Sequence, residues 1–74
     1  MVEHDERFFV DHLTKEKPYP KKTFMEAERY ARKLVKNYGC RAVIHYQGKQ
    51  VAVCSIGCGG KIWTDLTSYG AILI

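Results

Sequence analysis

The chain lacks a long apolar run and has few of the residues that build a secreted fold. No stretch approaches the roughly 18 apolar residues that a membrane-spanning helix needs. The first residues are acidic, where a secretory signal would be basic and then apolar. The three cysteines are an odd number, so we expect reduced thiols rather than a disulfide framework. These absences predict a cytoplasmic protein that does not enter a membrane.

The chain is also too short for more than one thin core. At 74 residues, a domain buries only about 60% of the surface that its unfolded form exposes. Hydrophobic residues make up 46% and charged residues 27%, which is a globular composition. We therefore expect a single domain over residues 1–74, with a loose N-terminus at residues 1–6 and no separate catalytic domain.

Motifs that would identify a nucleotide or nucleic-acid site are missing. The glycine-rich segment 57–60 is not followed by Gly-Lys-Ser/Thr at P-loop spacing, and we expect it to be a loop between strands. The aromatic signature of an RNA-recognition sheet and the ligand spacing of a zinc finger are absent as well. The remaining information lies in apolar periodicity and charge.

The clearest pattern predicts an amphipathic helix between Thr23 and Gly39. Thr23 and Glu26 fit a capping box, and glycine takes the left-handed conformation that ends a helix. Between them, apolar residues recur at spacings of three and four, which indicates one buried face. That face comprises Phe24, Ala27, Ala31, Leu34, Val35 and Tyr38.

Strands are expected at 7–14, 40–46, 49–56 and 61–66, which are rich in β-branched and aromatic residues. Residues 15–22 hold both prolines, so we expect an extended connector there, not a helix or a central strand. The predicted fold is α+β, one amphipathic helix packed on an antiparallel sheet of three to five strands in the order β-α-β-β-β.

Gln47 and Gly48 favour a two-residue hairpin turn, because glycine tolerates positive φ. The preferred register then places Ile44 opposite Val51. A loop one residue longer would instead place Ile44 opposite Ala52, so both registers stay open. The apolar tail, 69–74, is expected either to form a last strand of the sheet or to expose an adhesive edge.

Positive charge is concentrated in the middle of the chain. Residues 15–41 carry nine Lys and Arg against three Glu, a net charge of +6, whereas residues 1–14 carry −3. Such a stripe neutralises phosphates or attracts acidic partners. It also complements the helix dipole without any partner, since acids precede bases along the helix. The helical part of the stripe is Arg29, Arg32, Lys33 and Lys36; the flanking part is Lys15, Lys17, Lys21, Lys22 and Arg41.

The cysteines raise two hypotheses that we do not favour. Cys54 and Cys58 have a spacing that zinc accepts, with His45 or His12 as a further ligand, but a second ligand pair is missing. In the preferred register Cys40 and Cys54 also point to opposite faces. A thiol nucleophile at Cys54 or Cys58 with His45 as base fits the residue types, but a core this small leaves little room for a pocket. We expect no metal, no cofactor and no enzymatic activity.

The favoured function is docking on a protein or nucleoprotein partner through the sheet edge, Trp63 and the apolar tail, assisted by the basic helix. Trp63 has an alternative role in covering the open face of the sheet. The other expected function is direct nucleic-acid binding by the helix. Pairing of the tail with its two-fold copy would also make a homodimer. The expected partner-binding residues are Arg29, Arg32, Lys33, Lys36, Trp63, Ile72 and Ile74.

Two resemblances bear on these expectations. The segments TFMEAERYARKLVKNYGCRAVIHYQGK and GKIWTDLTSYG resemble small uncharacterised bacterial domains that end in Ser-Tyr-Gly, relative to which residues 50–59 are inserted. That resemblance implies a β-α-β-β layout and no activity. In size, charge and fold class the chain is similar to small phage-encoded inhibitors of host nucleoprotein machines, which implies an inhibitor or adaptor.

Overall fold

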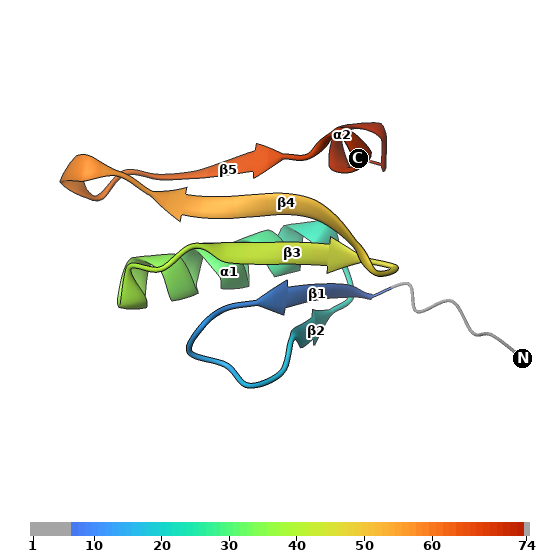
Figure 1. The fold of residues 1–74 in the computed structure, drawn as a ribbon, viewed down its shortest axis with the longest axis horizontal. Coiled ribbons are helices and arrows are strands. Elements are labelled where there is room, and N and C mark those ends of the chain that lie inside the picture. Colours follow the sequence, from blue (N-terminus) through green and yellow to red (C-terminus); the bar gives the residue numbers. More distant parts are fainter. Residues whose placement is uncertain (1–6, 74) are drawn as a thin grey trace, which may run out of the picture.

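A five-stranded antiparallel sheet forms one layer of the protein and the helix α1 forms the other (Figure 1). The computed structural model describes residues 7–73, so the expected loose N-terminus and Ile74 lie outside the described residues. The strand order across the sheet is β2-β1-β3-β4-β5. The α+β class is confirmed, with one short strand more than the expected order. In chain order the elements are β1 (Phe8–Asp11), β2 (Tyr19–Lys21), α1 (Phe24–Tyr38), β3 (Ala42–Tyr46), β4 (Lys49–Ile56), β5 (Ile62–Leu66) and α2 (Ser68–Leu73).

Helix α1 begins and ends where its caps predict. The Thr23 hydroxyl accepts a hydrogen bond of 3.2 Å from the Glu26 N–H. Gly39 ends the helix at φ 77° and donates to the Val35 carbonyl at 2.8 Å. Tyr38, on the last turn, stays more than half exposed, so its expected burial is wrong; the centre of its ring lies 5.8 Å from that of His12. The buried residues of the helix are Ala27, Ala31, Leu34 and Val35.

The connector expected at residues 15–22 contains the edge strand β2. It pairs antiparallel with β1, with Pro20 opposite Phe9. Proline is tolerated there because an edge strand has one side on which no N–H is needed. This pairing brings Lys21 alongside α1, a neighbourhood that periodicity alone does not predict.

The β3–β4 hairpin has the predicted turn but not the preferred register. Gln47 and Gly48 both have positive φ, and Tyr46 pairs with Lys49 as expected. A bulge then shifts the pairing, so that Ile44 lies opposite Ala52, and the preferred pairing of Ile44 with Val51 is wrong. Val51 and Ala52 are both fully buried in the core. A bulge turns two successive residues toward one face, and here that buries two apolar side chains instead of one.

The C-terminal segment is a short helix, so the expectation of a last strand is wrong. The Thr67 hydroxyl accepts from the Gly70 N–H at 3.0 Å and donates to the Gln50 carbonyl at 2.6 Å. These bonds start α2 directly after β5. Gly70 packs against the backbone of Val51 so closely that a Cβ would overlap the Val51 carbonyl oxygen. Up to Leu73, where the described residues end, the tail therefore offers no strand for the homodimer expected from it.

The core lies between α1 and one face of the sheet, and Figure 1 shows no helix of residues 7–73 in front of the other face. At the end of β1, buried His12 donates from Nε2 to the Cys40 carbonyl at 2.9 Å and accepts at Nδ1 from the Thr14 N–H at 3.1 Å. Both ring nitrogens are thus satisfied, and they tie β1 to the segment after α1. None of the helices within residues 7–73 is long and apolar enough to cross a membrane.

Candidate binding surfaces

Three positively charged side chains line a hollow of about 290 Å³ between α1 and β2. We call it the α1–β2 groove. Three cations reach it from two elements, one from β2 and two from successive turns of α1. A single carboxylate, that of Glu26, accompanies them. The lining residues are Lys21, Glu26, Arg29, Tyr30 and Lys33.

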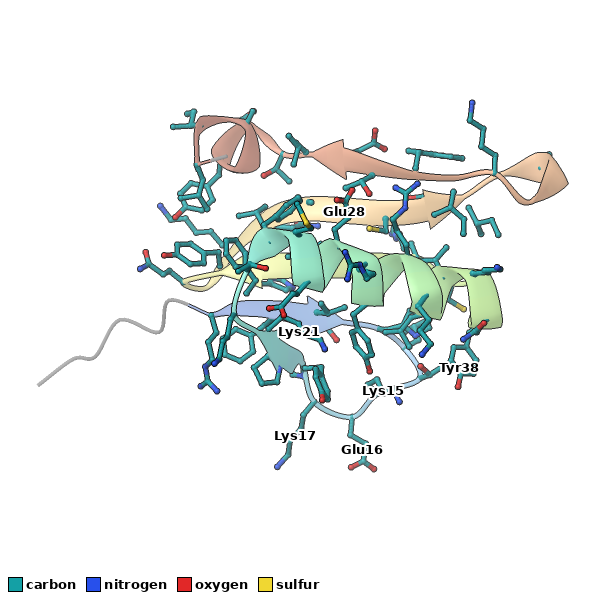
Figure 2. The ribbon with its side chains drawn as sticks, turned by 180° about the vertical axis from the view of Figure 1, so that it is seen from behind. Lys15, Glu16, Lys17, Lys21, Glu28 and Tyr38 are labelled. Atoms are coloured by element: carbon teal, nitrogen blue, oxygen red, sulfur yellow. The ribbon has the colours of Figure 1, made fainter. Side chains whose placement is uncertain are left out.

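Aromatic rings hold Lys21 in place at this groove. Its ammonium group lies 4.9 Å from the ring centre of Tyr19 and 5.0 Å from that of Tyr30. The two rings are themselves 4.8 Å apart. A cation over aromatic faces gains about 0.5–1 kcal/mol at an exposed site. Figure 2 shows Lys21 beside α1, with Lys15 and Lys17 on the loop that precedes β2.

On the helix side of the groove, positively charged side chains lie next to one another. Arg29 and Lys33 are four residues apart, a spacing at which like charges destabilise a helix by about 0.2–0.5 kcal/mol. Lys36 follows one turn further along. None of these three cations forms an ion pair with another residue in the described range 7–73. An anion bound in the groove would relieve this repulsion.

Arg32, the fourth cation expected on this surface, turns toward β5 instead. Its Nη1 donates to the Thr64 hydroxyl at 2.9 Å, and its Nη2 donates to the Ile62 carbonyl at 3.0 Å. Glu28 adds a carboxylate at 3.7 Å. Three internal partners therefore occupy the guanidinium, which stabilises the contact between helix and sheet.

Trp63 lies on the face of the sheet opposite α1. Its neighbours in β5, Ile62 and Thr64, face the helix, and alternation along the strand turns Trp63 to the open face. The indole N–H donates to the Asp65 carboxylate at 2.9 Å, and the ring covers Gly57, where a Cβ would lie 2.7 Å from it. The side chain is 38% exposed, so it covers part of the open face and remains accessible.

The other expected docking residue within the described range, Ile72, lies on α2 and is 86% exposed. Ile74 lies outside the described residues. The expected partner-binding residues that the structure describes thus do not form one surface. Arg29, Lys33 and Lys36 lie on the outside of α1, Trp63 lies on the opposite face of the molecule, and Ile72 lies at the end of the sheet.

The residues considered for zinc or thiol chemistry are also separated. Cys54 is buried beneath α1, Cys58 is exposed in the 3₁₀ turn after β4, and both are free thiols. His45 follows the core residue Ile44 and therefore faces the open side of the sheet, away from Cys54. Within residues 7–73, no three His, Cys, Asp or Glu side chains are placed to hold a metal ion. The bulged register does place Cys54 opposite Ala42, on the core face.

Burial raises the pKa of the Cys54 thiol. The hydrogen bond between its Sγ and the Thr64 hydroxyl, at 3.3 Å, opposes the rise, as does Arg32, whereas Glu28 adds to it. The net direction is upward, so the thiol is neutral at pH 7. Cys54 thus lacks the lowered pKa of a reactive cysteine, and His45, the base considered for it, lies on the other face of the sheet.

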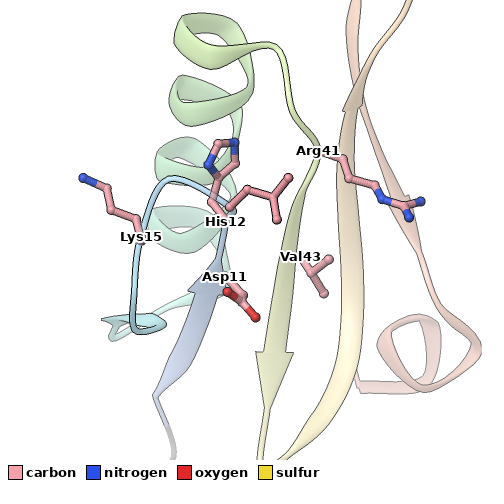
Figure 3. Close-up of a pocket in the computed structure, with 6 residues that line it drawn as sticks. Asp11, His12, Lys15, Arg41 and Val43 are labelled. Carbon is pink, nitrogen blue, oxygen red and sulfur yellow. The ribbon is translucent and has the colours of Figure 1, made fainter.

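A second hollow, of about 400 Å³, lies where β1 ends and β3 begins. Figure 3 shows Asp11 and Val43 on these neighbouring strands, with Lys15 on the following loop. Its charges are of both signs, and its histidine, His12, is fully hydrogen-bonded inside the fold. Its two cations and one carboxylate leave a smaller excess of positive charge than the three cations and one carboxylate of the α1–β2 groove. The lining residues are Asp11, His12, Leu13, Lys15, Arg41 and Val43.

Comparison of the chain with models of protein families, with curated proteins and with solved structures finds no match. The resemblances noted from the sequence therefore stay predictions. The sequence did not single out the aromatic support of Lys21. Tyr19 and Tyr30 are 11 positions apart, and only the pairing of β2 with β1 brings them together.

Proposed function

We propose that the protein is a non-enzymatic module that binds a nucleic-acid strand across the α1–β2 groove. The observation that carries this proposal is the convergence of Lys21, Arg29 and Lys33 on one hollow, although β2 and α1 are separate elements. Cations that converge on a groove neutralise successive phosphates and release counterions, which supplies most of the sequence-independent affinity for nucleic acids.

The aromatic side chains at the groove add a second kind of contact. Tyr19 is 46% exposed beside Lys21. Stacking of an unpaired base on an exposed ring contributes about 1–3 kcal/mol per base and tolerates any sequence. The groove thus suits a single strand better than a duplex, whose bases are already stacked.

Fluorescence anisotropy with labelled oligonucleotides, single-stranded and duplex, tests this function. Replacement of Lys21, Arg29 and Lys33 together by Gln should weaken binding at least about tenfold and lower the salt slope by about one for each phosphate that is no longer neutralised. The matched control replaces Arg7, Lys49 and Lys61 by Gln. It removes the same charge from other exposed positions and should bind almost as well as the wild type.

Two results would contradict the proposal. One is binding that both triple variants weaken equally, which would mean that only net charge matters. The other is the absence of salt-dependent binding by the wild type to any oligonucleotide. A preference for duplex would instead contradict the stacking role of Tyr19, which the single substitution Tyr19→Ala tests directly.

Docking on a protein or nucleoprotein partner is the second candidate, and the exposure of Ile72 favours it. A large aliphatic side chain on a short helix is a suitable anchor for an interface. An inhibitor or adaptor of the kind expected from the sequence would use such an anchor. Affinity capture from a nuclease-treated lysate would detect a partner, and Ile72→Lys should abolish its capture while the groove triple variant retains it. Capture from an untreated lysate that is lost both on nuclease treatment and in the groove variant would favour the nucleic-acid function.

A further inference from the structure

The outer strand β5 leaves one edge of the sheet open. Within residues 7–73 no strand lies beyond it, and it is five residues long. The opposite edge, β2, is three residues long and contains Pro20, so it is a poor template for another strand. Strand β5 itself contains neither proline nor lysine, the usual protections of an edge.

The backbone groups that face this edge follow from the ladder with β4. The Gly57 N–H donates to the Lys61 carbonyl at 2.9 Å, and the Thr67 N–H donates to the Val51 carbonyl at 3.0 Å. Residues alternate between facing the partner strand and facing away from it. The residues of β5 whose N–H and C=O groups point away from β4 are therefore Ile62, Thr64 and Leu66.

The side chains of β5 complement a second copy of the same strand. Antiparallel pairing about Thr64 places Ile62 opposite Leu66 of the second copy, and the two Thr64 residues opposite each other. It also places Trp63 opposite Asp65 of the second copy, so no two carboxylates meet. Within one chain the Trp63 indole already donates to Asp65, which shows that these two side chains suit each other.

We propose that two copies of this protein pair through β5 and form a continuous ten-stranded antiparallel sheet. Leu66 is 47% exposed in the single chain and would gain an apolar neighbour on pairing. The Ile62 carbonyl already accepts a hydrogen bond from Arg32, and its second lone pair serves the ladder. The proposal is independent of nucleic-acid binding.

The pairing also has a geometric consequence for the α1–β2 groove. A two-fold axis perpendicular to the sheet keeps paired side chains on the same face. Both copies of α1 would therefore cover the same face of the joined sheet, and both grooves would lie on one side of the dimer. A long strand bound to both grooves would gain affinity without any new contact.

Analytical ultracentrifugation of the full chain over a range of concentrations tests the pairing. We expect a monomer–dimer equilibrium. Leu66→Pro removes an N–H that the ladder with β4 does not use, and its matched control Leu66→Ala loses the side chain but keeps that N–H. The proline variant should have a dissociation constant at least about tenfold above that of the alanine variant, because two symmetric hydrogen bonds are lost.

A charge pair tests the register. Trp63→Glu places a carboxylate opposite Asp65 twice in the dimer and should weaken it about tenfold, whereas adding Asp65→Lys should restore pairing. Amide exchange should show Ile62 and Thr64 protected in the wild type and exposed in Leu66→Pro, with circular dichroism confirming that each variant folds. A wild type that stays monomeric, or a dimer that neither Leu66→Pro nor Trp63→Glu weakens, would overturn the proposal.

Discussion

Arg32 and Thr64 are joined by a hydrogen bond of 2.9 Å that ties the middle of α1 to the outer strand of the sheet. The Thr64 hydroxyl also contacts the Cys54 thiol, and the same guanidinium reaches the Ile62 carbonyl. One cation of the basic helix therefore belongs to the fold. Its neighbours Arg29 and Lys33 make no such bond to the sheet and line the α1–β2 groove instead.

Arg32→Gln should lower the free energy of unfolding by about 1–2 kcal/mol, because two hydrogen bonds from a charged donor are lost. It should leave nucleic-acid affinity nearly unchanged. Arg29→Gln is the matched variant, with the same chemical change three residues earlier, and should show the opposite pattern of weaker binding at unchanged stability. Urea denaturation and anisotropy titrations of both variants provide the two measurements. Equal loss of stability in both would contradict the structural role given to Arg32.

The raised pKa of the Cys54 thiol predicts a loss of stability at alkaline pH. The folded state keeps this proton at a pH where the unfolded chain has begun to release it. The contribution of this retained proton to the free energy of unfolding is therefore fully present below the unfolded-state pKa, about 8.5. It is lost as pH rises through the folded-state pKa.

Urea denaturation from pH 7 to 10 measures this effect. The free energy of unfolding of the wild type should fall more steeply above about pH 8.5 than that of Cys54→Ala, by at most about 1.4 kcal/mol per pH unit. Cys58→Ala, at an exposed position, should follow the wild-type slope. Parallel curves for the wild type and Cys54→Ala would show that burial of this thiol does not change how the free energy of unfolding depends on pH.

Gly70→Ala should destabilise the protein by about 1–3 kcal/mol, because the new methyl group overlaps the Val51 carbonyl and pushes α2 off β4. In an unconstrained helix the same change stabilises by about 1 kcal/mol, so the sign of the effect is diagnostic. Ser68→Ala, at an exposed position of the same helix, should have little effect. Thermal unfolding of the two variants makes the comparison, and a Gly70→Ala protein at least as stable as the wild type would refute the close packing of α2.

Gln47→Asn should stabilise the protein by about 0.5 kcal/mol. Gln47 has φ 52° and Gly48 has φ 77°, and asparagine before glycine is the preferred pair for a turn with positive φ at both positions. Gln50→Asn makes the same change in the extended strand β4, where asparagine is disfavoured, and should be neutral or destabilising. Chemical denaturation distinguishes them. A gain at position 50 rather than 47 would mean that the turn does not limit stability.

Local patterns were sufficient for α1, because its caps and its apolar spacing involve residues within a few positions of each other. The two-residue turn and the strand β5 followed for the same reason. The bulge could not be predicted this way. Either register buries an apolar residue opposite Ile44, and the choice depends on whether Val51 and Ala52 both reach the core. The tail was misassigned because an apolar composition suits a strand and a helix equally.

By itself, the sequence determined the fold class, the bounds of the main helix and the excess of positive charge, since these depend on composition and on short-range periodicity. Only the tertiary structure decided where each charged side chain lies and what it contacts. It directed Arg32 inward to β5, brought Lys21 next to Arg29 and Lys33 through the pairing of β2 with β1, and separated Trp63 from all of them. The physical reason is that side chains far apart in the chain meet only when strand pairing and core packing place their backbones, and neither leaves a periodic signal in the sequence.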